Sequence, residues 1–136
     1  KTDMPSIGEV GEPLVLTGTV KVLTNGEWVV RGPMYTGVKV FMGPTAVLEV
    51  GSMEIVVVSN HHEPWDTGVF TSVGIQPEHK RYLVLKSRIH YRAGFAPLAK
   101  HTLTLDGKGV TTSDNNLLAY QNVRRPVYPL DLINEA

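Results

Sequence analysis

The sequence predicts a mainly β fold with a few short helices, an α+β domain built on a mixed or barrel-like sheet. Val, Thr, Gly and Pro are frequent, and long runs with helical periodicity are missing. Short apolar segments recur at a spacing of about 8–12 residues, which is typical of a meander or a small barrel. The 136 residues suffice for a single domain that buries roughly two-thirds of its unfolded surface.

Segments in the first half of the chain read as strands, because they are rich in β-branched residues and end at Gly or Pro. Asn25-Gly26 predicts a hairpin between the first two segments. Ile55 to Val58 is apolar at every position, which predicts a central strand covered on both sides. The predicted strands cover residues 14–23, 27–33, 36–43, 45–51 and 53–60.

A short helix and a further strand are predicted next. Asp66 or Thr67 is expected to cap the helix, and Gly74 is expected to end it. Pro77 predicts a turn. Arg81 to Lys86 contains an apolar, strand-like run, which predicts a further strand.

The last third of the chain is expected to be less regular. Residues 94–100 are one helical turn or a loop, and His101 to Leu105 alternate as in a strand. A short helix over residues 113–120 would be capped by Ser113 or Asp114. Residues 124–129 contain two prolines, which predicts an extended tail.

Composition excludes several classes of function. Thirteen Lys and Arg balance thirteen Asp and Glu, so the chain lacks the basic field that nucleic acids and anionic membranes attract. No apolar run reaches the length of about 18 residues that a membrane span needs. The absence of cysteine excludes disulfides and thiolate zinc sites, and suits a reducing cytoplasm.

The stretch from Leu83 to Ala99 contains a cluster of basic side chains. At strand spacing, Lys86, Arg88, His90 and Arg92 would all lie on one face. Such a face could meet an anion, an acidic partner surface or a catalytic centre. The alternative is an edge strand whose charges are solvated.

The chain offers no complete active site. His61 and His62 would point to opposite faces of a strand, so we expect the His61-His62-Glu63 stretch to be a solvated strand end rather than a metal site. Ser87 and His90 would also lie on opposite faces, and no nucleophile-elbow motif is present. The sequence therefore favours a domain that supports chemistry housed elsewhere.

Several motifs together resemble a known family. Read in order, they resemble the C-terminal domain of MlrC-type proteins, a family named for the microcystin-degradation protein MlrC. The likeness covers most of the chain, and its last two motifs are the most specific. The motifs are Arg31-Gly32-Pro33-Met34-Tyr35-Thr36-Gly37, Gly43-Pro44-Thr45-Ala46-Val47-Leu48, Gly74-Ile75-x-Pro77, Lys86-Ser87-x-x-His90-Tyr91-Arg92-Ala93-x-Phe95-x-Pro97-x-Ala99 and Arg124-Arg125-Pro126-x-x-Pro129-Leu130-Asp131.

The resemblance implies that the chain is part of a bacterial, cytoplasmic, zinc-dependent hydrolase that acts on peptides, including linearised microcystin. The zinc ligands would lie in a larger N-terminal domain, so this domain would hold no cofactor, metal ligand or complete catalytic set and would be inactive alone. Residues 1–12 would be the domain junction, and residues 13–136 the C-terminal domain. Its partners would be its own N-terminal domain and the peptide substrate, not nucleic acid or membrane, and a homo-oligomer is left open.

Five side chains are candidates for substrate binding or for the domain interface. His90 and Arg92 would approach the substrate or the oxyanion of a peptide carbonyl, or would only hold the two domains together. Lys86 would bind a substrate carboxylate or an acidic residue across the interface. Arg124 and Arg125 could grip a carboxylate bidentately, or belong to an exposed tail.

Two other functions compete with this interpretation. One is a free-standing β interaction module that binds a partner through its basic face or an open strand edge. The other is a self-contained hydrolase that uses His90 with Ser87 or Asp66.

Overall fold

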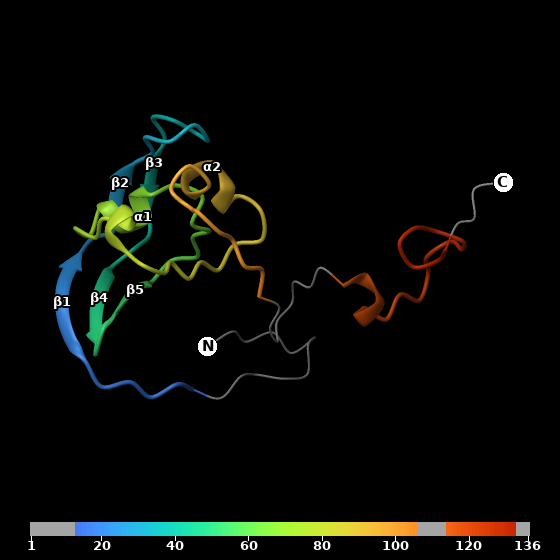
Figure 1. Ribbon diagram of the computed structural model, residues 1–136, viewed down its shortest axis with the longest axis horizontal. Coiled ribbons are helices and arrows are strands. Elements are labelled where there is room, and N and C mark those ends of the chain that lie inside the picture. The colour runs from blue at the N-terminus through green and yellow to red at the C-terminus, as the bar shows by residue number, and fades with distance from the viewer. Residues whose placement is uncertain (1–12, 106–113, 133–136) are drawn as a thin grey trace. The chain divides into compact units, whose positions relative to one another are not determined.

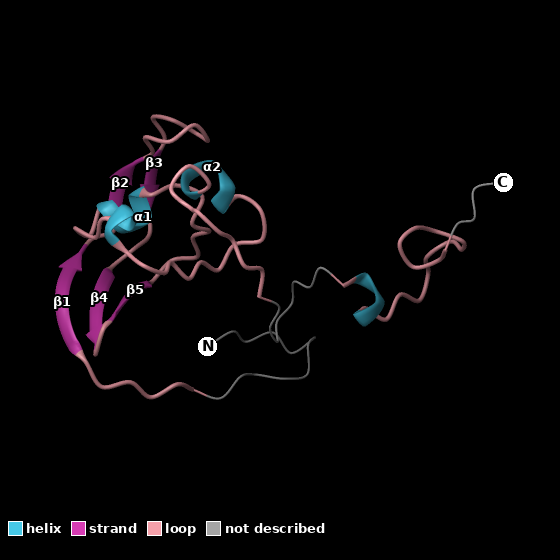
Figure 2. Ribbon diagram, in the orientation of Figure 1, coloured by secondary structure: helices cyan, strands magenta, loops and turns pink. Residues whose placement is uncertain are grey.

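The computed structural model describes residues 13–105 and 114–132, so the predicted junction at residues 1–12 lies outside the described part. The chain divides into two compact units. Figure 1 labels the strands and helices of the larger one. The larger unit, residues 15–102, contains all the described strands and most of the short helices (Figure 2). The predicted class, mainly β with a few short helices, is confirmed.

The main sheet has three antiparallel strands in the order β1-β4-β5. They are β1 (Thr19–Thr24), β4 (Thr45–Val50) and β5 (Met53–Val58). The prediction that Ile55 to Val58 form a central strand is wrong, because β4 occupies the centre and β5 pairs with β4 alone among the described strands. The first three residues of β4 alternate in burial, with Val47 only 1% exposed.

A second, two-stranded antiparallel sheet joins β2 (Glu27–Val29) to β3 (Lys39–Phe41). The hairpin predicted at Asn25-Gly26 is wrong, because β1 and β2 follow one another in the chain but belong to different sheets. The sequence did not distinguish a mixed sheet from a barrel-like one. The structure shows two small open antiparallel sheets.

Local hydrogen bonds explain why Asn25-Gly26 is a crossing point rather than a hairpin turn. The hydroxyl of Thr24 accepts from the Gly26 N–H, and the side-chain oxygen of Asn25 accepts from the Glu27 N–H, each at 3.1 Å. Gly26 has a φ of 75°, a conformation natural to glycine. Its carbonyl accepts from the Met42 N–H at 2.9 Å, which links the turn to the end of β3.

Three short helices complete the larger unit: α1 (Gly68–Thr71), η2 (Pro77–His79) and α2 (Tyr91–Phe95). Gly74, with a φ of 81°, ends the first of them as predicted. The Ile75 N–H donates to the Phe70 carbonyl at 3.0 Å, and the Gly74 N–H donates to the Thr71 carbonyl at 3.1 Å. This pair of bonds is the Schellman arrangement, which satisfies the free carbonyls at a helix end.

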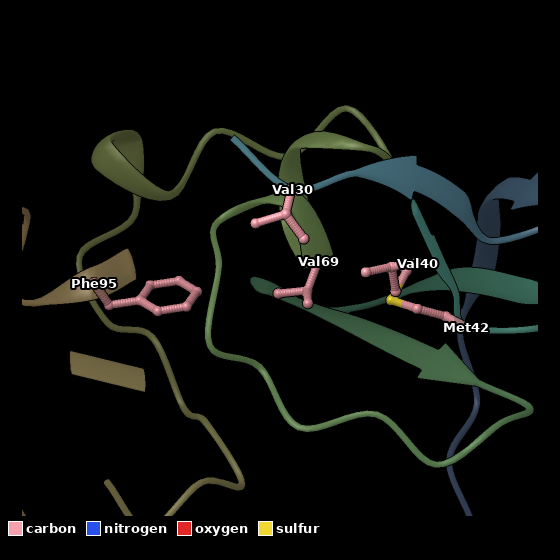
Figure 3. Close-up of a cluster of buried hydrophobic side chains, with 5 residues drawn as sticks. All are labelled: Val30, Val40, Met42, Val69 and Phe95. Atoms are coloured by element: carbon pink, nitrogen blue, oxygen red, sulfur yellow. The ribbon is translucent and has the colours of Figure 1, made fainter. Parts of the chain in front are cut away.

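Two hydrophobic clusters hold these elements together. Val47 on β4 packs with Val73 and Ile75 beyond α1. The larger cluster joins the two-stranded sheet to α1 and α2 (Figure 3). Its buried members are Val30, Val40, Met42, Val69 and Phe95.

Two of the predicted strands are absent from the described residues. Residues 82–87 are extended but pair with no strand, and residues 101–105 are likewise unpaired. The burial of the first segment nevertheless alternates as in a strand, because Leu83 and Leu85 pack on the larger cluster while Val84 is 85% exposed. The helical turn expected at residues 94–100 begins earlier, at Tyr91.

The described part of the smaller unit, residues 13–14, 103–105 and 114–132, contains the 3-10 helix η3 (Asn115–Leu117). The carboxylate of Asp114 caps it by accepting from the Asn116 N–H at 2.9 Å, as one of the two predicted caps. Ser113, the other, lies outside the described residues. Within the two described ranges, no helix is long and apolar enough to cross a membrane.

Asp66 connects the two-stranded sheet to α1 from a buried position. Its side chain is 2% exposed. One carboxylate oxygen accepts from the Gly68 N–H at 2.7 Å, as the predicted cap, and the other accepts from the Gly32 N–H at 2.6 Å. Gly94 of α2 approaches closely, since a Cβ there would lie 2.8 Å from the Asp66 Cα and 2.7 Å from the Trp65 carbonyl oxygen.

Replacing the Asp66 carboxylate should destabilise the fold. A buried N–H left without a partner costs about 1–3 kcal/mol, so we expect Asp66→Ala to lower the free energy of unfolding by about 3 kcal/mol. Asp66→Asn keeps one acceptor and should lose roughly half as much. Urea unfolding followed by tryptophan fluorescence measures both losses. Glu27→Ala, an exposed acidic control, should stay within about 0.5 kcal/mol of wild type; an Asp66→Ala midpoint equal to wild type would contradict the account.

Candidate functional site

Glu63 connects the segment after β5 to the start of α2. The Ser87 hydroxyl donates to one Glu63 oxygen at 2.5 Å, and His90 Nδ1 lies 2.8 Å from the other. The Ser87 oxygen also accepts from the Tyr91 N–H at 3.1 Å. Ser87 therefore ends the extended segment and fixes the first residue of α2.

The charge state of Glu63 favours this arrangement. Burial raises the pKa of Glu63, but the hydrogen bonds from Ser87 and His90, together with the charge on His90, outweigh it and lower the pKa overall. Glu63 is therefore a carboxylate at neutral pH and can only accept, so Nδ1 of His90 carries the hydrogen. The other ring nitrogen, Nε2, is left to exchange a proton or bind a ligand.

The four basic residues of this region form what we call the cationic turn: Lys86, Arg88, His90 and Arg92. Their placement on one strand face is wrong, because the chain bends after Ser87 and enters α2. All four are nevertheless exposed. Arg92 lies over the Tyr91 ring with 5.8 Å between the guanidinium carbon and the ring centroid. Among the four members of the cationic turn, His90 has an ion-pair partner within the described ranges, and that partner is Glu63.

Arg124 and Arg125 belong to the smaller unit, whereas the cationic turn belongs to the larger one. Arg125 grips a carboxylate bidentately, as its chemistry suggested, but the carboxylate is the chain's own Asp131. The hydrogen bond from Arg125 lowers the pKa of Asp131, and the Val127 N–H supports it by donating to the same carboxylate at 2.7 Å. Arg124 is exposed.

His62 lies among aromatic rings, so the prediction of a solvated strand end is wrong for it and for Glu63. Its ring meets Trp28 edge-on at 5.6 Å between centroids and Trp65 at 4.4 Å. Burial lowers the pKa of His62, and the charge of Glu63 opposes this more weakly. Within the part of the chain that the structure describes, the ring nitrogens Trp28 Nε1, His62 Nε2 and Trp65 Nε1 are buried without a hydrogen-bond partner.

The described residues do not assemble a zinc site. Over residues 13–105 and 114–132, no group of three or more His, Cys, Asp or Glu side chains is placed to hold a metal ion. His61 is exposed, His62 packs between indole rings, and the Glu63 carboxylate is hydrogen-bonded to Ser87 and His90. The three side chains of the His-His-Glu stretch therefore serve separate purposes.

Ser87 and His90 do not form a hydrolytic triad, although they lie closer together than the strand prediction implied. Both side chains bond to Glu63, so the carboxylate stands between them. In a Ser-His-acid triad the imidazole stands between the hydroxyl and the acid and removes the hydroxyl proton. The arrangement instead holds one oriented, exposed imidazole in a stretch of chain whose other basic side chains are also exposed, which is suited to binding an anionic group.

Sequence reasoning missed the structural roles of Glu63 and Ser87. A serine shortly before Tyr91-Arg92-Ala93 is a recognisable signal for a helix start. Glu63 gave no local signal, because its partners are 24 and 27 residues away.

The fold and the site together define a small mainly β domain that presents a cationic turn, with no metal centre among its described residues. A family model described as "MlrC C-terminus" matches residues 5–122, and the chain belongs to this family. The resemblance seen in the sequence is confirmed.

Two known proteins are similar to the chain. Microcystinase C from Sphingomonas sp. is 23% identical over 90 residues, which cover 66% of this chain and 17% of that protein. The crystal structure of a "Putative metallopeptidase" from Mesorhizobium sp. BNC1 matches with a TM-score of 0.68 and 26% identity, over 87% of this chain and 24% of that one. The matched part of the chain thus spans less than a quarter of the length of either.

The buried state of His62 predicts a pH dependence of stability. Because the folded pKa lies below the ordinary value of 6.5, the unfolded chain binds the proton more readily. Stability is therefore full above that value and falls as the pH drops toward the folded pKa. We expect His62→Phe, which keeps an aromatic ring, to lose less Tm between pH 8 and pH 5 than wild type.

Thermal unfolding across that pH range measures the difference. His61→Gln is the matched control one residue earlier, exposed in the structure, and should follow wild type. The lowered pKa of Glu63 acts in a separate window, since its contribution is lost below about its ordinary value of 4.5 in all three proteins. Identical profiles for wild type and His62→Phe would contradict the assignment.

Proposed function

We propose that this chain is the C-terminal domain of a zinc-dependent peptide hydrolase of the microcystin-degradation type. In this proposal it supports or completes a catalytic site whose zinc ligands lie in an N-terminal domain. Family membership and the similarity to Microcystinase C and to a "Putative metallopeptidase" support it. We place the protein in the bacterial cytoplasm, where a chain without cysteine loses nothing to reducing conditions.

The observation that carries the proposal is the exposed imidazole of His90, which Glu63 orients within the cationic turn. An imidazole held by a carboxylate is prepared to donate or accept a proton at one fixed nitrogen. Arg92, two residues later and exposed, can offer a pair of N–H groups to a carboxylate or an oxyanion. We assign both to the peptide group undergoing cleavage, and Lys86 to a substrate carboxylate or an acidic residue of the other domain.

Zinc, in this proposal, is bound entirely outside the described residues, which hold no cluster able to bind it. This domain would contribute positive charge to the catalytic site. Three exposed cationic side chains, Lys86, Arg88 and Arg92, lie within four residues of His90 in the chain and would favour peptides that carry a free carboxylate. Arg125, which is already paired with Asp131, would shape its own segment rather than bind substrate.

The alternative function is a β interaction module that uses the same cationic turn to bind an acidic partner. It needs no second domain and no substrate. Under this alternative His90 and Arg92 contribute to affinity for the partner and not to turnover. Removing either side chain would therefore lower turnover under the first function and affinity for the partner under the second.

The test uses His90→Ala and Arg92→Ala in the full-length enzyme. Losing a donor aimed at developing charge typically costs roughly 10²-fold in turnover, and we expect each variant to lower kcat/KM for a linear peptide by about that factor. Arg92→Lys should recover part of the loss, because the charge remains but the paired donors do not.

Arg81→Ala, which removes an exposed positive charge outside the cationic turn, is the matched control and should leave kcat/KM unchanged. Zinc content and Tm are measured on every variant, so that a folding defect is recognised. Unchanged kcat/KM in both His90→Ala and Arg92→Ala would overturn the proposed role.

A further inference from the structure

The two faces of the β1-β4-β5 sheet differ in what covers them. The strands lie side by side in Figure 1. The face that carries Val47 packs against Val73 and Ile75 beyond α1. The register places eight other apolar residues of the three strands on the opposite face, which we call the apolar sheet face: Val20, Leu23, Ala46, Leu48, Val50, Met53, Ile55 and Val57.

Half of the apolar sheet face is exposed to solvent in the described structure, and its other four residues are half-buried. Leu23 is 76% exposed, Met53 is 56% exposed and Val20 is 52% exposed. Neither hydrophobic cluster includes any residue of this face. At one end of it, Leu23, Ala46 and Val57 line a shallow hollow.

The distribution of charge on this sheet is the reverse of the usual one. Antiparallel sheets with one wet face normally place their polar residues there. Here the strand carboxylates lie on the helix-covered face: Glu49 pairs with Lys21, and Glu54 pairs with Lys80. The apolar sheet face carries no charged or polar side chain. A surface of this composition is typical of a permanent interface.

The sequence of β5 points the same way. Its last residues, Ile55 to Val58, are apolar at every position, a pattern typical of strands covered on both sides. The described residues pack on one side of the sheet, and no hydrophobic cluster among them covers the other side. The matched regions account for 17% of the length of Microcystinase C and 24% of that of the solved relative. Most of such a protein therefore lies outside the matched region.

We propose that the apolar sheet face is the surface on which this domain docks against the N-terminal domain of its own polypeptide. The inference rests on the proposed function, because it assumes that the longer polypeptide exists. An uncharged, apolar partner surface is required, since any charge set against this face would be desolvated without a counter-charge. The cationic turn then takes no part in docking the two domains and remains available to bind substrate.

Cysteine labelling tests the proposal, because the chain contains no cysteine of its own. Leu23→Cys and Val57→Cys place a thiol on the apolar sheet face. Val38→Cys is the matched control, since Val38 is 49% exposed, close to the 45% of Val57, and lies between the strands of the other sheet. Each variant is made both in the 136-residue chain and in the full-length protein, and the labelled peptide is quantified by mass spectrometry after timed maleimide treatment.

We expect all three thiols to react readily in the 136-residue chain. In the full-length protein, the two on the apolar sheet face should react roughly tenfold or more slowly, because buried sites react only on transient opening, while Val38→Cys keeps its rate. Equal rates in both proteins would overturn the proposal. Slow labelling of the sheet-face thiols already in the 136-residue chain would also overturn the proposal. If that protection depends on protein concentration, a second copy of the chain covers the face. If it does not, other residues of the same chain cover it.

Peptide hydrolysis by the same full-length variants separates this inference from the proposed function. If the face is protected from labelling in a protein that hydrolyses no peptide, the docking proposal stands and the hydrolase function is contradicted. Hydrolysis by a protein whose face stays reactive would keep the assignment and overturn the docking surface.

Discussion

The larger unit depends on one buried carboxylate, that of Asp66. Its two oxygens receive N–H groups from segments 34 residues and two residues away, Gly32 and Gly68. A buried charge is tolerated only when hydrogen bonds replace its hydration, and here two short bonds do so. Because Gly32 follows β2 and Gly68 begins α1, this side chain sets the position of the helix over the two-stranded sheet and over the hydrophobic cluster beneath it.

The candidate site takes its geometry from the same junction. Gly94 allows α2 to approach the backbone of Trp65 and Asp66 without a side chain between them. That approach brings the start of α2 to Glu63, three residues before Asp66, where Ser87 and His90 bond to the carboxylate. A structural carboxylate and a site carboxylate thus lie on one short segment. The apolar sheet face lies on the other sheet, so binding another domain and binding a ligand need not compete for one surface.

The sequence predicted the features that depend on neighbouring residues. The strands around β4 and β5, the helix ended by Gly74 and the caps at Asp66 and Asp114 follow from local pattern and turn chemistry. The errors came from distant partners. Residues 81–86 have the apolar run of a strand, yet no strand pairs with them in the described chain, and β1 pairs with β4 instead of forming the predicted hairpin with β2. The contact between Glu63 and His90 spans 27 residues and leaves no local trace.

The most direct test of the account is the mass of the natural gene product, measured on protein from the source cells. The account treats this domain as one part of a metallohydrolase whose remaining sequence supplies the zinc ligands and covers the apolar sheet face. It predicts a polypeptide several times longer than these 136 residues, with an N-terminal region rich in acidic residues and histidine. A natural product of about this length would contradict it and would favour a free-standing interaction module.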